Sequence, residues 1–127
     1  METETAEITI EKPVDDVWSL VGDFAEMSWM KGVDSVTVDD DVRTVSMGGA
    51  AIKEQLVNLD EDEHRLTYSI IEGPVPIDSH QATISVIPAG DGCMVTWSVT
   101  SEPDGTAAFF HDVYSGALKA LKEKAES

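Results

Sequence analysis

The sequence lacks the features that mark membrane-spanning and disulfide-rich proteins. It has a single cysteine, Cys93, so no internal disulfide can form, and its 127 residues are enough to bury a core without one. No apolar run approaches the ~20 residues that cross a bilayer, and the N-terminus has no basic or apolar signal segment. We therefore expect one soluble, cytoplasmic domain over residues 1–127.

Positive charge is scarce. Lys and Arg number 8 against 25 Asp and Glu, which gives a formal net charge of -17. So acidic a surface repels phosphate backbones and anionic lipid headgroups. We therefore expect no nucleic-acid partner and no membrane insertion, and a monomer or weak homodimer in solution.

The motifs of the common enzyme classes are also missing. There is no glycine-rich phosphate loop after a strand, no CxxC or HExxH, and no nucleophile elbow. The histidines are scattered, with His64 in a turn, His80 in a strand pattern and His111 on a helix flank. We expect neither a metal nor a cofactor, and any catalysis would be acid/base work on a bound ligand.

The N-terminal part predicts one strand and two short helices. Apolar residues alternate with polar ones over residues 4–11, which is typical of a half-buried strand, and Pro13 ends it. Apolar residues three to four apart then predict a short helix that closes at Gly22. Asp23 is a candidate cap for a second short helix that runs to about Trp29.

Residues 33–102 predict an antiparallel meander of about six strands. The period is two, and turn residues interrupt it at 39–41, 48–49, 60–63, 73–76 and 89–92. After Pro103 the spacing becomes helical, with Asp104 as a candidate N-cap and apolar residues as far as Leu121. The expected fold is α+β, a curved seven-stranded antiparallel sheet around a long C-terminal helix.

Strand parity predicts which side chains face the helix. If Gly48 and Gly49 form a two-residue loop, Arg43 lies directly opposite Glu54. A mostly apolar lining with a few polar groups is typical of a small-molecule pocket. The candidate ligand-binding residues on this face are Arg43, Val45, Met47, Ile52, Glu54, Tyr68, Ile70, His80, Trp97, Phe110, Tyr114 and Leu118.

Glu54 and His80 are the candidate catalytic groups, and each has a structural alternative. Glu54 either fixes the hairpin through an ion pair with Arg43, or accepts a hydrogen bond or a proton from a ligand. His80 is either a histidine satisfied within the core or a proton shuttle.

Several segments resemble a known family. They are Val42-Arg43-Thr44-Val45, Gly48-Gly49 followed by Ile52-Lys53-Glu54-Gln55-Leu56, the stretch from Leu66 to Pro74, and the stretch from Gly90 to Trp97. They resemble the bacterial polyketide cyclase/dehydrase-like branch of the SRPBCC superfamily, which includes START lipid-transfer domains and the birch-pollen allergen family. The resemblance implies a helix-grip fold with a hydrophobic cavity under the C-terminal helix. It also implies two gate loops. They are the Ser46-to-Ala51 hairpin, with Gly48 and Gly49, and the Gly73-to-Ile77 loop, with Pro74, Val75 and Pro76.

Three functions remain open from the sequence. The first is the binding or carriage of a small hydrophobic or amphipathic molecule. The second is a cofactor-independent cyclase or dehydrase that uses Glu54 and His80. The third is an interaction module whose cavity is filled by its own side chains and whose acidic surface meets a basic partner.

Overall fold

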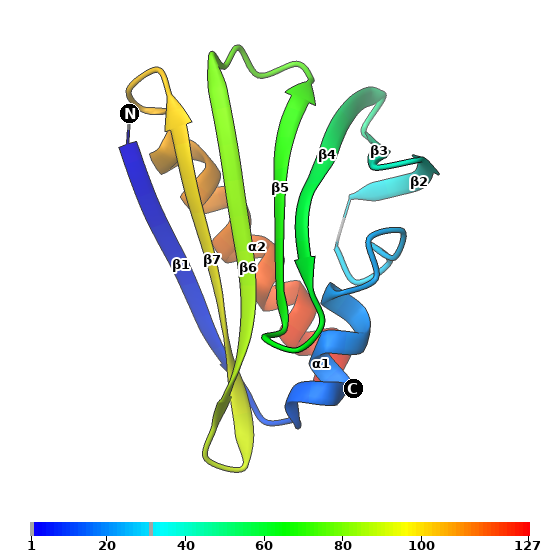
Figure 1. Ribbon diagram of the computed structural model, residues 1–127, viewed down its shortest axis with the longest axis vertical. Coiled ribbons are helices and arrows are strands. Elements are labelled where there is room, and N and C mark those ends of the chain that lie inside the picture. Colours follow the sequence, from blue (N-terminus) through cyan, green and yellow to red (C-terminus); the bar gives the residue numbers. More distant parts are fainter. Residues whose placement is uncertain (1, 31) are drawn as a thin grey trace.

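The computed structural model describes residues 2–30 and 32–127, which form seven strands and two helices. In chain order these are β1 (Glu2–Ile10), α1 (Val14–Val21), β2 (Val33–Asp39), β3 (Val42–Met47), β4 (Ala50–Asp60), β5 (Arg65–Glu72), β6 (Ser79–Ala89), β7 (Gly92–Glu102) and α2 (Thr106–Glu126). The strands make one antiparallel sheet in the order β1-β7-β6-β5-β4-β3-β2, and α2 runs along one face of it (Figure 1). The helix-grip prediction is confirmed.

The second short helix does not form. α1 ends at Val21, with Gly22 as its C-cap as expected, but residues 23–30 are a pair of turns. The carboxylate of Asp23 accepts the amide hydrogen of Ala25, and that of Glu26 accepts the amide hydrogen of Ser28. These local bonds compete with the helical hydrogen-bond pattern, which explains the difference.

The long helix begins later than its predicted cap. Asp104 makes no cap, and α2 starts at Thr106 after Gly105, whose φ of 93° is left-handed. The amide of Gly105 donates instead to the carboxylate of Glu2 at 2.8 Å. Glu2 belongs to β1, so the residues around position 104 gave no sign of this hydrogen bond.

The core lies between α2 and the inner face of the sheet. In β7 every second residue is buried, as the alternation predicted, and Cys93 is among them. The matching side chains on α2 are Phe110, Tyr114, Ala117, Leu118 and Leu121. Neither helix in the described part of the chain is long and apolar enough to cross a membrane.

Two details of the sheet position the site. The β3–β4 hairpin has the predicted register, which sets Arg43 opposite Glu54 and Met47 opposite Ala50. On the other side, β5 pairs with β6 only through residues 65–68 and then diverges from it. The separation of these two strands leaves backbone groups that need other partners.

Candidate functional site

A cavity lies beneath α2 on the inner face of the sheet. Its volume is about 140 Å³, close to that of engineered apolar cavities of ~150 Å³ that bind benzene. It is lined by Met27, Met30, Val45, Met47, Ile52, Glu54, Tyr68, Ile70, Gly73, Pro74, Val75, Trp97, Phe109, Phe110, Val113 and Tyr114. The volume is therefore of the size that holds one aromatic ring.

Most of the predicted lining residues border this cavity, but three do not. Leu118 is one turn beyond Tyr114 and is buried in the core instead. Arg43 donates to Glu54, which lines the cavity, and His80 contacts the hydroxyl group of Tyr114. Strand parity identified the inner face correctly, but it could not show which inner residues a neighbouring side chain covers.

The predicted gate loops differ in their position. Pro74 and Val75 line the cavity, whereas Pro76 borders a shallow hollow beside it. Gly48 and Gly49 form the hairpin tip next to Met47 but do not themselves line the cavity. In the loop between β5 and β6, residues 73–75 therefore line the cavity.

Four lining residues lie outside the predicted set, namely Met27, Met30, Phe109 and Val113, whereas Gly73 belongs to the predicted second gate loop. Phe109 and Val113 had a signal, because they belong to the apolar face of the C-terminal helix. Their side chains are 49% and 38% exposed, so they lie at the edge of the cavity and not in the core. The two methionines are in the turns that replace the expected second helix.

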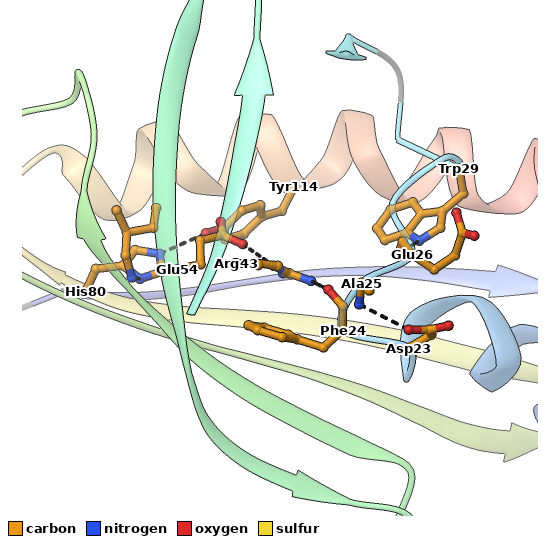
Figure 2. A network of polar contacts seen from close by, with 10 residues as sticks. Asp23, Phe24, Ala25, Glu26, Trp29, Arg43, Glu54, His80 and Tyr114 are labelled. Carbon is orange, nitrogen blue, oxygen red and sulfur yellow. Dashed lines mark hydrogen bonds and ion pairs between the residues drawn. The ribbon is translucent and has the colours of Figure 1, made fainter. Parts of the chain in front are cut away.

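Arg43 and Glu54 form a buried ion pair next to the cavity. The Nε–H of Arg43 donates to Oε1 of Glu54 at 2.7 Å, and the two side chains are only 5% and 10% exposed. Figure 2 shows the guanidinium between this carboxylate and the carbonyl oxygen of Phe24, which accepts from Nη1 at 3.0 Å. The guanidinium also lies over the rings of Phe24 and Tyr68, at 4.3 and 5.2 Å from the centroids. The positive charge of Arg43 is thus compensated by groups of the protein itself.

Burial raises the pKa of the Glu54 carboxyl above its ordinary value, although Arg43 opposes this effect. Glu54 lines the cavity, whereas Arg43 does not. Glu54 is therefore the charged side chain that a ligand would meet among the described lining residues.

His80 bridges the place where β5 and β6 diverge. Its Nδ1 accepts the amide hydrogen of Ile70 at 3.1 Å, and its Nε2 lies 2.8 Å from the hydroxyl oxygen of Tyr114. Because Nδ1 accepts, the neutral ring carries its proton on Nε2 and donates it to Tyr114. Both ring nitrogens are used, so His80 has no free position for a ligand.

Two tyrosines complete the polar end of the cavity. Burial raises the pKa of Tyr68 and of Tyr114, and the carboxylate of Glu54 raises both further. Each hydroxyl also influences the pKa of the other, so the two groups lie close together. Both therefore stay protonated at neutral pH and can act as hydrogen-bond donors.

Protonation of His80 is expected to destabilise the fold. Burial lowers the pKa of His80 from 6.5 to about 4. Between these two pH values the unfolded chain binds a proton at His80 that the folded chain does not bind. The contribution of the neutral His80 to the free energy of unfolding is therefore complete above pH 6.5 and is lost as the pH falls towards 4. The loss is on the order of 3 kcal/mol, measured as the free energy of unfolding in urea across this range.

The histidine variants provide the control for this pH dependence. His80→Gln is expected to remove most of this dependence of the free energy of unfolding on pH. His64→Gln and His111→Gln should keep it, since neither of those two side chains is buried as His80 is. Equal slopes in the wild type and in His80→Gln would contradict the assignment.

The described residues offer no donor set for a metal ion, because no three His, Cys, Asp or Glu side chains gather in a suitable group. Nothing in the cavity lining is typical of a phosphate or nucleotide site either, since its polar groups are Glu54, two tyrosines and Trp97. This arrangement can enclose a mostly apolar molecule and form hydrogen bonds with a polar group that the molecule carries.

The long helix gripped by a curved sheet, with an apolar cavity between them, defines a helix-grip protein. Residues 1–126 match the family described as "Polyketide cyclase / dehydrase and lipid transport". The chain belongs to this family, which confirms the resemblance to the SRPBCC superfamily. No curated protein sequence matches it.

Solved structures agree with this assignment. The protein XoxI from Bacillus cereus is 30% identical with a TM-score of 0.93, over 100% of this chain and 97% of that one. A putative uncharacterized protein from Bacillus thuringiensis is 28% identical with a TM-score of 0.93, over 99% and 100%. Ara h 8.0201 is 16% identical with a TM-score of 0.79, over 98% and 97%, and this likeness concerns the fold alone.

Proposed function

We propose that this protein binds a small hydrophobic or amphipathic molecule in the cavity beneath α2. The observation that carries the proposal is the cavity itself, whose wall is apolar except at one end. Lining of this kind is typical of small-molecule sites, and its volume suits a ring-sized ligand. The family description, which includes lipid transport, is consistent with this function.

Three methionines in the wall, Met27, Met30 and Met47, allow larger ligands. A methionine side chain is unbranched and adapts its shape at low cost, so the cavity can enlarge by rotamer changes. The exposed edge formed by Phe109 and Val113 would contact the part of a ligand that extends out of the cavity.

The acid/base alternative has less support. It requires Glu54 and His80 to meet the same ligand, but His80 is outside the cavity lining and both of its nitrogens have protein partners. The interaction-module alternative requires a filled cavity, and an open volume of about 140 Å³ speaks against it.

Blocking the cavity tests the proposal. Ile70 lines the cavity, whereas its neighbour Ile71 is 53% exposed on the other face of β5. Ile70→Trp is expected to weaken the binding of the neutral probe 2-methoxynaphthalene at least about ten-fold, because the indole occupies the ligand's space. Ile71→Trp should bind like the wild type. Isothermal titration calorimetry measures all three.

Native mass spectrometry of the freshly purified protein provides a second measurement. An adduct retained by the wild type and by Ile71→Trp but absent from Ile70→Trp would identify the natural ligand by mass. Equal binding of the probe by the two tryptophan variants would contradict the proposed cavity.

A further inference from the structure

The polar end of the cavity has one hydrogen-bond acceptor that the protein leaves unused. Oε1 of Glu54 accepts from Arg43, but Oε2 has no hydrogen-bond partner among the described residues. Among the described residues, Nε1 of Trp97 is the one fully buried side-chain polar atom that has no hydrogen-bond partner. Oε2 therefore keeps some accessible surface, and Glu54 lines the cavity in which a ligand would meet it.

A donor lies beside this acceptor. The hydroxyl oxygen of Tyr114 accepts the Nε2–H of His80. A hydrogen bond with Tyr114 raises the pKa of Tyr68, which is the effect expected when the Tyr68 hydroxyl is the donor, so the hydrogen of Tyr114 remains available. The ring of Tyr114 is stacked on Trp97 with a centroid distance of 4.1 Å, which fixes the direction of the phenol. Glu54 and Tyr114 both line the cavity, and the charge of Glu54 raises the pKa of the Tyr114 hydroxyl.

The charges beside the cavity disfavour a carboxylate, an ether or a plain hydrocarbon at its polar end. Arg43 and Glu54 together have no net charge, and Arg43 is held by Glu54, Phe24 and the ring of Tyr68. A carboxylate on the ligand would meet the free oxygen of Glu54 without a cation to balance it. An ether or a simple hydrocarbon would leave that oxygen without a hydrogen bond. A hydroxyl group both donates and accepts, and so satisfies Glu54 and Tyr114 together.

We propose that the ligand is a neutral, ring-containing molecule with a hydroxyl group, which donates to Oε2 of Glu54 and accepts from the hydroxyl group of Tyr114. This inference rests on the proposed function, since it specifies the ligand class of the same cavity. The hydroxyl is at the inner end of the ligand, and the apolar part extends towards Phe109 and Val113.

Three naphthalene probes of similar size test this specificity. They are 2-naphthol, which has a hydroxyl donor, 2-methoxynaphthalene, which has the oxygen without the donor, and 2-naphthoate, which is an anion. Calorimetry at neutral pH is expected to show that the wild type binds 2-naphthol about ten-fold more tightly than 2-methoxynaphthalene, because a hydrogen bond to a charged acceptor is stronger than a neutral one. 2-Naphthoate should bind at least about ten-fold more weakly than 2-naphthol.

Glu54→Gln should change the order of these affinities. The advantage of 2-naphthol over 2-methoxynaphthalene is expected to fall to about three-fold or less, because the acceptor is no longer charged. Binding of 2-naphthoate should improve about ten-fold, since the guanidinium of Arg43 loses its counter-ion and attracts the anion. Glu63→Gln, which removes the same charge from an exposed turn, should keep the wild-type order.

The outcomes separate this inference from the proposed function. Equal affinities of the wild type for 2-naphthol and 2-methoxynaphthalene, or tightest binding of 2-naphthoate, overturn the hydroxyl specificity and leave the binding cavity standing. If the wild type binds none of the three probes, the proposed function fails as well. The comparison of probes on the wild type needs no variant, so it holds even if Glu54→Gln does not fold.

Discussion

Replacing Arg43 by methionine is expected to lower the free energy of unfolding by about 3 kcal/mol at neutral pH. The substitution keeps the apolar stem but removes the guanidinium, so the buried carboxylate of Glu54 loses its partner. It also removes the bond to the carbonyl oxygen of Phe24 and the contacts with two aromatic rings. Chemical denaturation measures the loss.

The pH dependence of this loss distinguishes its cause. Without Arg43, burial alone acts on Glu54 and raises its pKa further above 4.5. For a carboxyl group whose pKa is raised on folding, stability is complete below the unfolded pKa and is lost as the pH rises through the folded one. The destabilisation should therefore be small near pH 4 and increase towards neutral pH.

The partner substitution should behave differently. Glu54→Leu leaves a guanidinium that cannot lose its proton, so its cost should not decrease at acid pH. The double variant Arg43→Met with Glu54→Leu should recover a large part of either single loss, because no unpaired buried charge remains. Additive losses in the double variant, or unchanged stability in both single variants, would contradict the buried pair.

Gly92→Ala is expected to destabilise the protein by about 3 kcal/mol. A Cβ atom at Gly92, the first residue of β7, would overlap the carbonyl oxygen of Ile10 and approach the Cα of Glu11 to 3.2 Å. Both are backbone atoms at the end of β1, so no side-chain rotation relieves the overlap. The edge strand would have to move away from β7, with which it pairs along its whole length.

Gly116→Ala is the matched control. It lies within α2, and a Cβ atom there meets nothing within 4 Å. Alanine is favoured over glycine in a helix by about 1 kcal/mol, so this variant should be slightly more stable than the wild type. Thermal unfolding of the two variants should therefore give shifts of opposite sign. A neutral Gly92→Ala would show that the end of β1 moves easily.

The part of the site that sequence reasoning predicted best was the β3–β4 hairpin. Two consecutive glycines determine the loop, the loop determines the register, and the register determines that Arg43 meets Glu54. This inference succeeds because each step depends on residues near each other in the sequence. The buried alternation of β7 was predictable for the same local reason.

The place of His80 could not be predicted in this way. Parity put it on the inner face, and it is there, but its ring binds the amide of Ile70 because β5 and β6 separate after Tyr68. Where two strands separate depends on the curvature of the whole sheet, and the period of a single strand does not contain that information. The candidate catalytic role of His80 depended on this detail.

The sequence by itself determined the class of fold, the face of each strand that is buried and the pairing of Arg43 with Glu54. These features follow from periodicity and turn chemistry, which act over a few residues. Only the tertiary structure decided which inner side chains reach the cavity, since that depends on what covers each of them. Arg43 is paired with Glu54, His80 binds Tyr114 and Leu118 is in the core, whereas Phe109 and Val113 lie at the cavity edge. Contacts between residues far apart in the chain, as between Tyr114 and His80, arise only when the packed elements bring them together.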